Sequence, residues 1–335
     1  MPINTALLAC LRRAVPALSL SILALATSAP AQTPSAANYP SKPIKILVGF
    51  TPGGGPDIIA RVLAQKLTEE WKQPVIVENR LGAGSNIAAQ ALATSTPDGY
   101  TLLSVSSAHA ISPAIYGKLP YDVLKDFAGI TLTATGPALV IVSAQSGINS
   151  MADLIALAKA KPGQMNYSSA GVGSGSQFAV ELLKAQAGID LLHIPFKGIP
   201  EALTDTMAGR TQVFISPYAS AINLVREGRA KAIAVTSRTR MPDLPDLPTV
   251  HEAGVPGYQW IFWYGLLAPA KTPQPIIDKL NAQVGAVLQQ PQVQQRFAPL
   301  GIAPLTGTPQ GLDQMVQDEV RSFKKLAQAA AITAD

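Results

Sequence analysis

Three consecutive glycines, Gly53 to Gly55, follow a short apolar run and precede a helix-like segment. Glycines at such a junction let a ligand approach the backbone closely, and the start of the next helix offers unpaired N–H groups with partial positive charge. The segment from Phe50 to Asp57 is therefore predicted to bind an anion without a basic side chain, with a simple tight turn as the alternative. Asp57 is interpreted as a cap of the helix N-terminus in preference to a catalytic acid.

Three other polar or glycine-rich segments occur in the same kind of place. Gly82 to Ser85 precede a second helix-like segment, Ser104 to Ser107 end a strand-like one, and Ser168 to Ser176 join a strand to a helix. Because strand-to-helix turns meet at the carboxyl edges of the strands, these segments are expected to lie together. They supply backbone amides and hydroxyls with few charges, which favours a carboxylate held by neutral donors.

Nucleotide-binding motifs are incomplete in this chain. Gly171 and Gly173 begin a dinucleotide fingerprint, but Ser176 stands where the third glycine is required and no suitably placed acid follows. Lys197-Gly198 has the reverse of the order found in a Walker motif. No cofactor is therefore predicted.

The residues needed for nucleophilic catalysis are also poorly placed. A nucleophile elbow requires glycine two residues before the serine. That position holds Val172 in the case of Ser174, and Ser174 in the case of Ser176. The histidines stand singly along the chain: His109, His193 and His251. Each is interpreted as structural, although His109 lies near the predicted binding edge. We therefore expect neither catalysis nor a bound metal.

Composition limits the class of protein. Of 335 residues, 47% are hydrophobic and 14% are charged, which excludes a disordered chain. That length allows for about two domains. The formal charge of +5 includes no run of Lys or Arg, so nucleic-acid binding is not expected. Cys10 is the only cysteine, which excludes a thiolate zinc site, a disulfide framework and a cysteine nucleophile in the folded body.

Residues 1–31 have the order of a secretory signal peptide. Two arginines supply positive charge, residues 14–26 are mostly apolar, and residues 29–31 (Ala-Pro-Ala) form a small-x-small cleavage site. The apolar run is shorter than the ~20 residues that a membrane-spanning helix needs. We predict cleavage after Ala31 and a soluble mature protein in a bacterial periplasm.

Strand-like and helix-like segments alternate along the rest of the chain. The strand-like segments are 44–50, 75–77, 101–105, 139–143, 165–169, 192–194, 213–216, 230–236 and 258–267. The helix-like segments are 58–71, 86–94, 151–160, 178–187, 201–207, 222–227, 275–288, 293–299 and 311–330. This alternation predicts an α/β fold with parallel sheets covered by helices.

Residues 240–257 are rich in proline, which predicts a long connection. A consistent layout has the chain leave one domain near Gly136 and return to it near Gly257. Lobe 1 would then comprise residues 32–136 and 258–335, and lobe 2 residues 137–257. We expect a ligand cleft between these two lobes.

Short segments in a fixed order carry a family resemblance across nearly the whole mature chain. In the first half they are 39–44 (YPSKPI), 50–57 (FTPGGGPD), 78–85 (ENRLGAGS), 97–100 (PDGY) and 119–122 (LPYD). In the second half they are 193–198 (HIPFKG), 247–254 (LPTVHEAG) and 263–269 (WYGLLAP). The ordered set is specific, and it resembles the Bug family, the substrate-binding receptors of tripartite tricarboxylate transporters.

The resemblance implies a two-lobed type II periplasmic binding protein fold that closes over a small carboxylate and delivers it to membrane permease subunits. We expect a monomeric binding protein and not an enzyme. A loop from each lobe would hold the ligand through backbone groups, hydroxyls and bound waters. The residues of these two loops are Thr51, Pro52, Gly53, Gly54, Ser169, Ala170, Gly171 and Ser174. Further contacts are expected from Gly84, Ser85, Ser106 and Ser107.

Two departures from the family pattern bear on the ligand. Ser216 stands where relatives often carry an Asp able to pair with an ammonium, so we predict a ligand without an ammonium. This ligand would carry a second carboxylate or a ring facing Tyr218, and dicarboxylates, tricarboxylates and aromatic acids all remain open. His109 stands where relatives usually have an apolar residue, and either touches the ligand or is a surface substitution. The alternative functions are a secreted hydrolase that uses a loop serine and a receptor that presents its ligand to a membrane sensor.

Overall fold

The structure is a computed structural model that describes residues 36–334. These residues belong to one compact unit, Pro34–Asp335. The predicted signal peptide, with Cys10, lies outside the described residues. None of the helices within residues 36–334 combines the length and apolar character required to cross a membrane.

Most helices and strands lie close to the predicted segments, but the helix Ala108–Ile115 and the strand Ala303–Pro304 were not predicted. The first part of the chain contains β1 (Ile44–Val48), α1 (Gly55–Trp71), β2 (Val75–Asn79), α2 (Asn86–Ala93), β3 (Thr101–Ser106) and α3 (Ala108–Ile115). The middle contains β4 (Phe127–Val142), α4 (Met151–Ala160), β5 (Asn166–Ser169), α5 (Gly175–Ala187), β6 (Leu192–Pro195), α6 (Ile199–Met207), β7 (Val213–Pro217), α7 (Tyr218–Arg226) and β8 (Lys231–Val235). The last part contains β9 (Ile261–Pro269), α8 (Gln274–Gln289), α9 (Pro291–Phe297), β10 (Ala303–Pro304) and α10 (Pro309–Ala329). Three short 3₁₀ helices are Ala36–Asn38, Ala83–Ser85 and Ala298–Leu300.

The strands form two groups that share β4. The first lobe contains β2, β1, β3, β9 and the N-terminal part of β4, and the second lobe contains β7, β5, β6, β8 and the C-terminal part of β4. Only β1 with β2 and β3, and β5 with β6 and β7, pair in parallel. The prediction of parallel sheets was wrong for β4 and β9, which run antiparallel to their neighbours because the chain passes between the lobes along them. The α/β, two-lobed fold class is confirmed.

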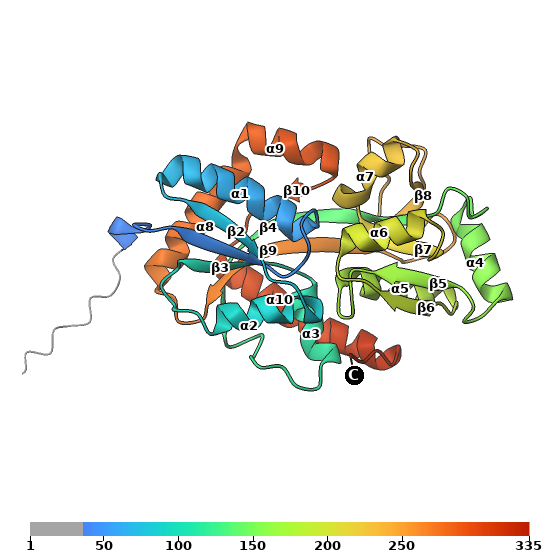
Figure 1. The fold of residues 1–335 in the computed structure, drawn as a ribbon, viewed down its shortest axis with the longest axis horizontal. Coiled ribbons are helices and arrows are strands. Elements are labelled where there is room, and N and C mark those ends of the chain that lie inside the picture. The colour runs from blue at the N-terminus through green and yellow to red at the C-terminus, as the bar shows by residue number, and fades with distance from the viewer. Residues whose placement is uncertain (1–35, 335) are drawn as a thin grey trace, which may run out of the picture. The chain divides into compact units, whose positions relative to one another are not determined.

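Strand β4 is much longer than the segment predicted for it. The sequence indicated 139–143, whereas the strand begins at Phe127 and first pairs with β9 up to Pro137. From Ala138 onward it pairs with β7. Figure 1 shows β4 and β9 running side by side from the strands of the first lobe toward those of the second. Polar residues such as Thr131 and Thr133 are buried in this strand, which hides it from a search for apolar runs.

Helices cover the sheet through apolar faces that the sequence shows as helical periodicity. In α1, Ile59, Leu63 and Leu67 recur every four residues and are fully buried, which stabilises the fold by roughly 1.5–3 kcal/mol for each side chain. Figure 1 shows α1 and α8 on one side of the first lobe's strands, and α2, α3 and α10 on the other. Helix α4 begins with a capping box, in which Ser150 accepts a hydrogen bond of 3.1 Å from the Asp153 backbone N–H.

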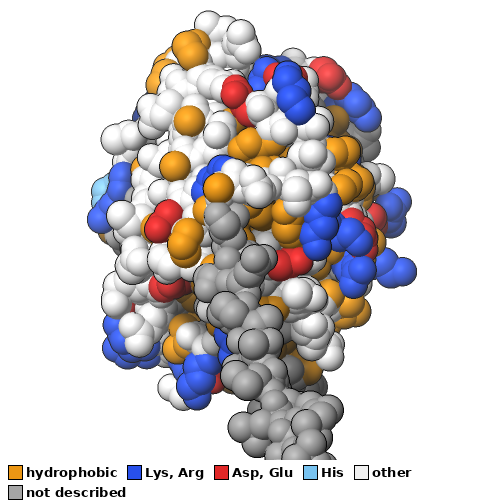
Figure 2. All heavy atoms as spheres, turned by 90° about the vertical axis from the view of Figure 1, so that its left-hand side faces the viewer, with side chains coloured by type: hydrophobic (Ala, Val, Ile, Leu, Met, Phe, Trp, Pro, Cys, Tyr) orange, Lys and Arg blue, Asp and Glu red, His pale blue; other side chains and the backbone are white. Residues whose placement is uncertain are grey.

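Charged side chains on the surface are mixed in sign. Figure 2 shows Lys and Arg interspersed with Asp and Glu on one face of the molecule. Opposite charges pair, as in Lys42–Asp98 at 2.9 Å and Arg240–Glu252 at 2.9 Å. This face therefore offers no extended basic surface of the kind that follows a phosphate backbone.

Candidate ligand-binding site

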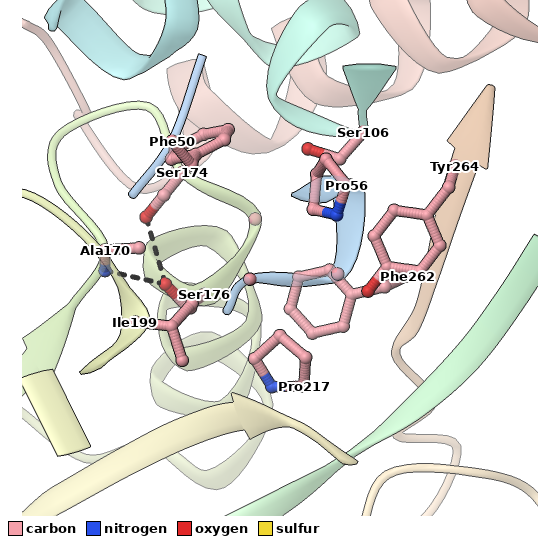
Figure 3. Close-up of a pocket in the computed structure, with 13 residues that line it drawn as sticks. Phe50, Pro56, Ser106, Ala170, Ser174, Ser176, Ile199, Pro217, Phe262 and Tyr264 are labelled. Carbon is pink, nitrogen blue, oxygen red and sulfur yellow. Dashed lines mark hydrogen bonds between the residues drawn. The ribbon is translucent and has the colours of Figure 1, made fainter. Parts of the chain in front are cut away.

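A cavity lies where loops from both lobes meet (Figure 3). Its empty volume, which includes space open to solvent, is about 350 Å³. The residues that line it are Phe50, Gly54, Gly55, Pro56, Ser106, Ala170, Ser174, Gly175, Ser176, Ile199, Pro217, Phe262 and Tyr264. None of them is charged, and the polar side chains among them are three serine hydroxyls and one tyrosine hydroxyl.

Five helices begin at or beside the wall of this cavity. Gly55, Gly175 and Ile199 are the first residues of α1, α5 and α6, and Pro217 precedes the first residue of α7. Ser106 lies two residues before the start of α3. The first N–H groups of a helix lack intrahelical partners and carry partial positive charge, so the cavity attracts an anion although no Lys or Arg lines it.

Asp57 organises the first glycine loop. Its carboxylate is buried, accepts a 3.0 Å hydrogen bond from the Gly53 N–H, and is paired at 2.9 Å through both oxygens with Arg61. Asn79 donates a further bond of 3.0 Å to Asp57. Burial alone would raise the pKa of this carboxyl, but the bonds from Arg61, Asn79 and Gly53 outweigh it and hold the pKa below its usual value. Asp57 therefore acts within the first turn of α1, as the sequence indicated, and shapes the loop without lining the cavity.

The second loop satisfies its own polar groups. The Ala170 N–H donates to Ser176 Oγ at 3.0 Å, and Ser176 Oγ lies 3.0 Å from Ser174 Oγ, as the dashed lines in Figure 3 show. Ser174 also accepts from the Gln177 N–H at 3.3 Å, and Gln177 in turn accepts from the Gly173 N–H at 2.8 Å. These bonds hold the loop rigidly at the start of α5.

Ser169, at the end of β5, forms a short hydrogen bond with a histidine from β6. Ser169 Oγ lies 2.6 Å from His193 Nε2 and accepts a 3.1 Å bond from the Gly171 N–H. His193 stacks on Tyr167 with 4.8 Å between ring centroids, and burial together with nearby Lys184 lowers the pKa of His193 to about 4. Ser169 is fully buried and does not line the cavity, so its hydroxyl supports the loop and is not exposed to a bound molecule.

Other predicted residues lie around the cavity at the boundary between the lobes. Four of them line it: Gly54, Ser106, Ala170 and Ser174. Thr51 Oγ1 lies 3.5 Å from the Glu201 carboxylate of the second lobe, and Ser220 donates a 3.2 Å bond to the Gly53 carbonyl. A Cβ on Gly84 would lie 2.7 Å from the Val172 carbonyl oxygen. The lining residues do not include Thr51, Pro52, Gly53, Gly84, Ser85, Ser107, Ser169 or Gly171.

Ser216, which departs from the family pattern, and Tyr218, which was expected to face the ligand, do not line the cavity. Ser216 is fully buried behind Pro217, to whose carbonyl it donates at 3.2 Å. The Tyr218 hydroxyl donates to Asp243 at 2.6 Å, and its ring packs against Gly301, so it does not face the cavity. The ring contact expected at Tyr218 is therefore not available in this structure.

His109 lines a separate hollow. This hollow has an empty volume of about 400 Å³ and includes Phe127 and Asp313. His109 is buried, packs edge-on against Phe127 with 4.8 Å between centroids, and its pKa is lowered to about 4 by burial. The expectation of a surface substitution was wrong, and the structure does not bring His109 to the main cavity.

Nine lining residues were not among the individual ligand contacts expected from the sequence, although five of them lie within the predicted segments 50–57 and 168–176. They are Phe50, Gly55, Pro56, Gly175, Ser176, Ile199, Pro217, Phe262 and Tyr264. A signal existed for the two on β9, because Phe262 and Tyr264 alternate with Trp263 and must share one face of the strand. Which face meets the cavity depends on the neighbours of β9, and these are not visible in its own sequence.

Acidic and histidine side chains do not form a metal centre here. Within residues 36–334, no group of three or more His, Cys, Asp and Glu residues is arranged to hold an ion. The arrangement is suited to holding a small anion by neutral donors, between loops of two lobes.

Comparison with known proteins agrees with this geometry. The structure of an R. palustris protein with adipate has a TM-score of 0.85 and 33% identity to this chain, covering 88% of this chain and 99% of that one. MatC from Rhodopseudomonas palustris with bound malate has a TM-score of 0.82 and 32% identity, covering 86% and 99%. BugD, a periplasmic binding protein, has a TM-score of 0.84 and 31% identity, covering 88% and 99%.

Sequence relatives lead to the same family. Protein BugT of Bordetella pertussis is 34% identical over 301 residues, which covers 89% of this chain and 92% of the relative. Residues 59–332 match the family described as tripartite tricarboxylate transporter family receptor. The chain therefore belongs to this family of solute-binding receptors.

Proposed function

We propose that the protein is an extracytoplasmic receptor that binds a small carboxylate between its lobes and delivers it to the permease of a tripartite tricarboxylate transporter. One observation carries the proposal: a cavity without charged side chains lies where five helices begin. A carboxylate is a common small anion, and such neutral donors can hold it where no basic side chain is present. The ligands of two relatives, adipate and malate, support this chemistry.

The two glycine-containing loops are proposed to close on the ligand as the lobes move together. Residues 32–136 with 258–335 would form one moving body and residues 137–257 the other. The change of β4 partner from β9 to β7 at Pro137 and Ala138 supports this division. Contacts of Thr51 with Glu201 and of Gly53 with Ser220 join the two bodies.

The ligand is proposed to lack an ammonium group. No acidic side chain lines the cavity, so an ammonium would lose its hydration without gaining an ionic partner. The neutral Ser216 beneath Pro217 agrees with this, because an Asp there would bring a negative charge close to the wall. Amino acids such as glutamate should therefore bind more weakly than acids of similar size without the amine.

Binding without catalysis is the proposed activity. Among residues 36–334, the Ser169–His193 pair resembles a nucleophile and its base, with 2.6 Å between Oγ and Nε2. Ser169 is buried, and its Oγ accepts a hydrogen bond from the Gly171 N–H. This arrangement supports a structural role for the bond between Ser169 and His193. The signal-peptide pattern of residues 1–31 supports a periplasmic location for the mature receptor, which we expect to act as a monomer.

The first experiment is thermal unfolding of the mature chain, from Gln32 onward, with a panel of acids. The panel comprises citrate, succinate, adipate, benzoate, terephthalate, nicotinate, glutamate and aspartate. An acid present at 100 times its dissociation constant should stabilise the native state by ~2.7 kcal/mol, which raises the melting temperature by several degrees. Absence of a shift with every acid would contradict the proposal.

A matched pair of variants tests whether the cavity selects for negative charge. Ser106→Asp places a carboxylate at the cavity wall, whereas Ser106→Asn adds a neutral side chain of nearly equal size. Ser106→Asp should abolish acid binding through repulsion, and Ser106→Asn should keep a measurable part of it. Equal binding by the two variants would show that charge at this wall is irrelevant.

A further inference from the structure

Two hydroxyls on neighbouring strands face the cavity together. Ser106 of β3 and Tyr264 of β9 are directly opposite in the antiparallel register, so their side chains lie on one face of the sheet. Figure 3 shows Ser106 above Pro56, and Tyr264 to the right of Pro56 and Phe262. Neither residue was recognisable as half of a pair from its local sequence.

These hydroxyls differ from the others in the cavity because they have no partner. Ser174 and Ser176 bond to each other and to backbone N–H groups of their own loop. The structure gives no hydrogen bond for Ser106 or Tyr264 with any of the described residues. Beside them, Ser107 Oγ is buried without a partner at the start of α3, and its side chain does not cap that helix.

The start of α1 is fixed directly above the pair. Ser104 Oγ donates a 3.0 Å hydrogen bond to the Pro56 carbonyl, which ties the first turn of α1 to β3. A Cβ on Gly55 would lie 2.3 Å from Tyr264 Oη, so the backbone of α1 packs against the tyrosine ring. Burial raises the pKa of Tyr264, so its hydroxyl stays protonated and able to donate.

Apart from Ser174 and Ser176, the side chains that line the rest of the cavity are apolar. Phe50, Ile199, Pro217 and Phe262 supply side chains without a hydrogen-bonding group. A second carboxylate placed against these four side chains would lose its hydration without gaining a hydrogen-bond donor from them.

We propose that the carboxylate of the ligand binds to the hydroxyls of Ser106 and Tyr264 beneath the start of α1, and that the rest of the ligand is apolar. The preferred class is a monocarboxylate with a hydrocarbon body of about ring size, such as benzoate or cyclohexanecarboxylate. This inference rests on the proposed function and specifies both its ligand class and a donor outside the two glycine-containing loops.

Calorimetric titration of the mature protein tests the ligand class. Benzoate and cyclohexanecarboxylate should bind at least ten times more tightly than succinate or citrate, and neutral benzamide should not bind. Tighter binding of succinate or citrate would overturn the inference while leaving the carboxylate receptor intact. Absence of binding by every acid would overturn both.

Removal of one hydroxyl tests the donor. Tyr264→Phe should weaken benzoate binding by about 10- to 100-fold, the usual effect of losing a hydrogen bond to a charged group. Tyr39→Phe is the matched control, because its buried hydroxyl bonds to the Gly99 carbonyl at 2.6 Å and does not line the cavity. Ser106→Ala should weaken binding in the same direction as Tyr264→Phe. Unchanged affinity in both Tyr264→Phe and Ser106→Ala would overturn the assignment.

Discussion

Gly175 lies at a close approach between the two lobes and offers a direct test of closure. It begins α5, and a Cβ at this position would lie 2.5 Å from Ser107 Oγ and 2.7 Å from Phe262 Cε1. Ser107 and Phe262 belong to the first lobe, whereas Gly175 belongs to the second. Gly175→Ala should therefore oppose the closed arrangement and leave an open one unstrained.

The size of the effect follows from the overlap. Both distances are well inside the 3.4–4 Å of ordinary contact, and the Phe262 ring cannot bend away as a flexible chain would. Overpacking of this kind costs ~1–3 kcal/mol. If only the closed state bears that cost, ligand affinity falls by ~5- to 140-fold, at about 1.4 kcal/mol for each factor of ten. Unfolding of the unliganded protein should change little.

Gly54→Ala is the matched control. Gly54 also lines the cavity and also stands at a helix start, but a Cβ there would meet its nearest neighbours at 3.7 Å or more. Calorimetry with the tightest acid of the panel and thermal unfolding without ligand should be measured for both variants. Loss of affinity in Gly175→Ala alone supports closure. Equal affinities for Gly175→Ala and the wild type would refute the reasoning.

Three further predictions concern stability and the absence of hydrolysis. His109 and His193 have pKa values of about 4 when folded and near 6.5 when unfolded, so protons bind the unfolded chain preferentially between these values. The free energy of unfolding should fall as pH is lowered from about 6.5 to about 4, by at most ~3 kcal/mol for each histidine. In His109→Leu, this free energy, measured by urea unfolding, should fall less steeply over the same pH range. Asp57→Asn should lower the free energy of unfolding by ~1–3 kcal/mol at pH 7, because its bonds to Arg61 are weakened. Since the Asp57 pKa is lowered in the fold, the difference from wild type in urea unfolding should shrink at acidic pH. Wild type should hydrolyse p-nitrophenyl acetate no faster than Ser169→Ala, and a faster wild-type rate would revive the hydrolase alternative.

Local structure was largely readable from the sequence. The apolar periodicity of α1, the Ser150 capping box and the glycine loop before Asp57 depend on residues close together in the chain, so their physical causes are visible there. The same is true of the loops after β1, β3 and β5, because the ends of strands and the starts of helices carry recognisable residue types. These local signals were enough to predict an anion site built from neutral donors.

What only the tertiary structure decided is the far wall of that site. Strand β9 inserts between β3 and β4 and thereby sets Tyr264 opposite Ser106, a pairing between segments far apart in the sequence. Long β4 joins the lobes with buried threonines that carry no apolar signal. His109 was misjudged for a related reason, since its burial against Phe127 depends on how α3 packs on β4. Pairing and packing between distant segments depend on the free energy of the whole fold, which no single stretch of sequence displays.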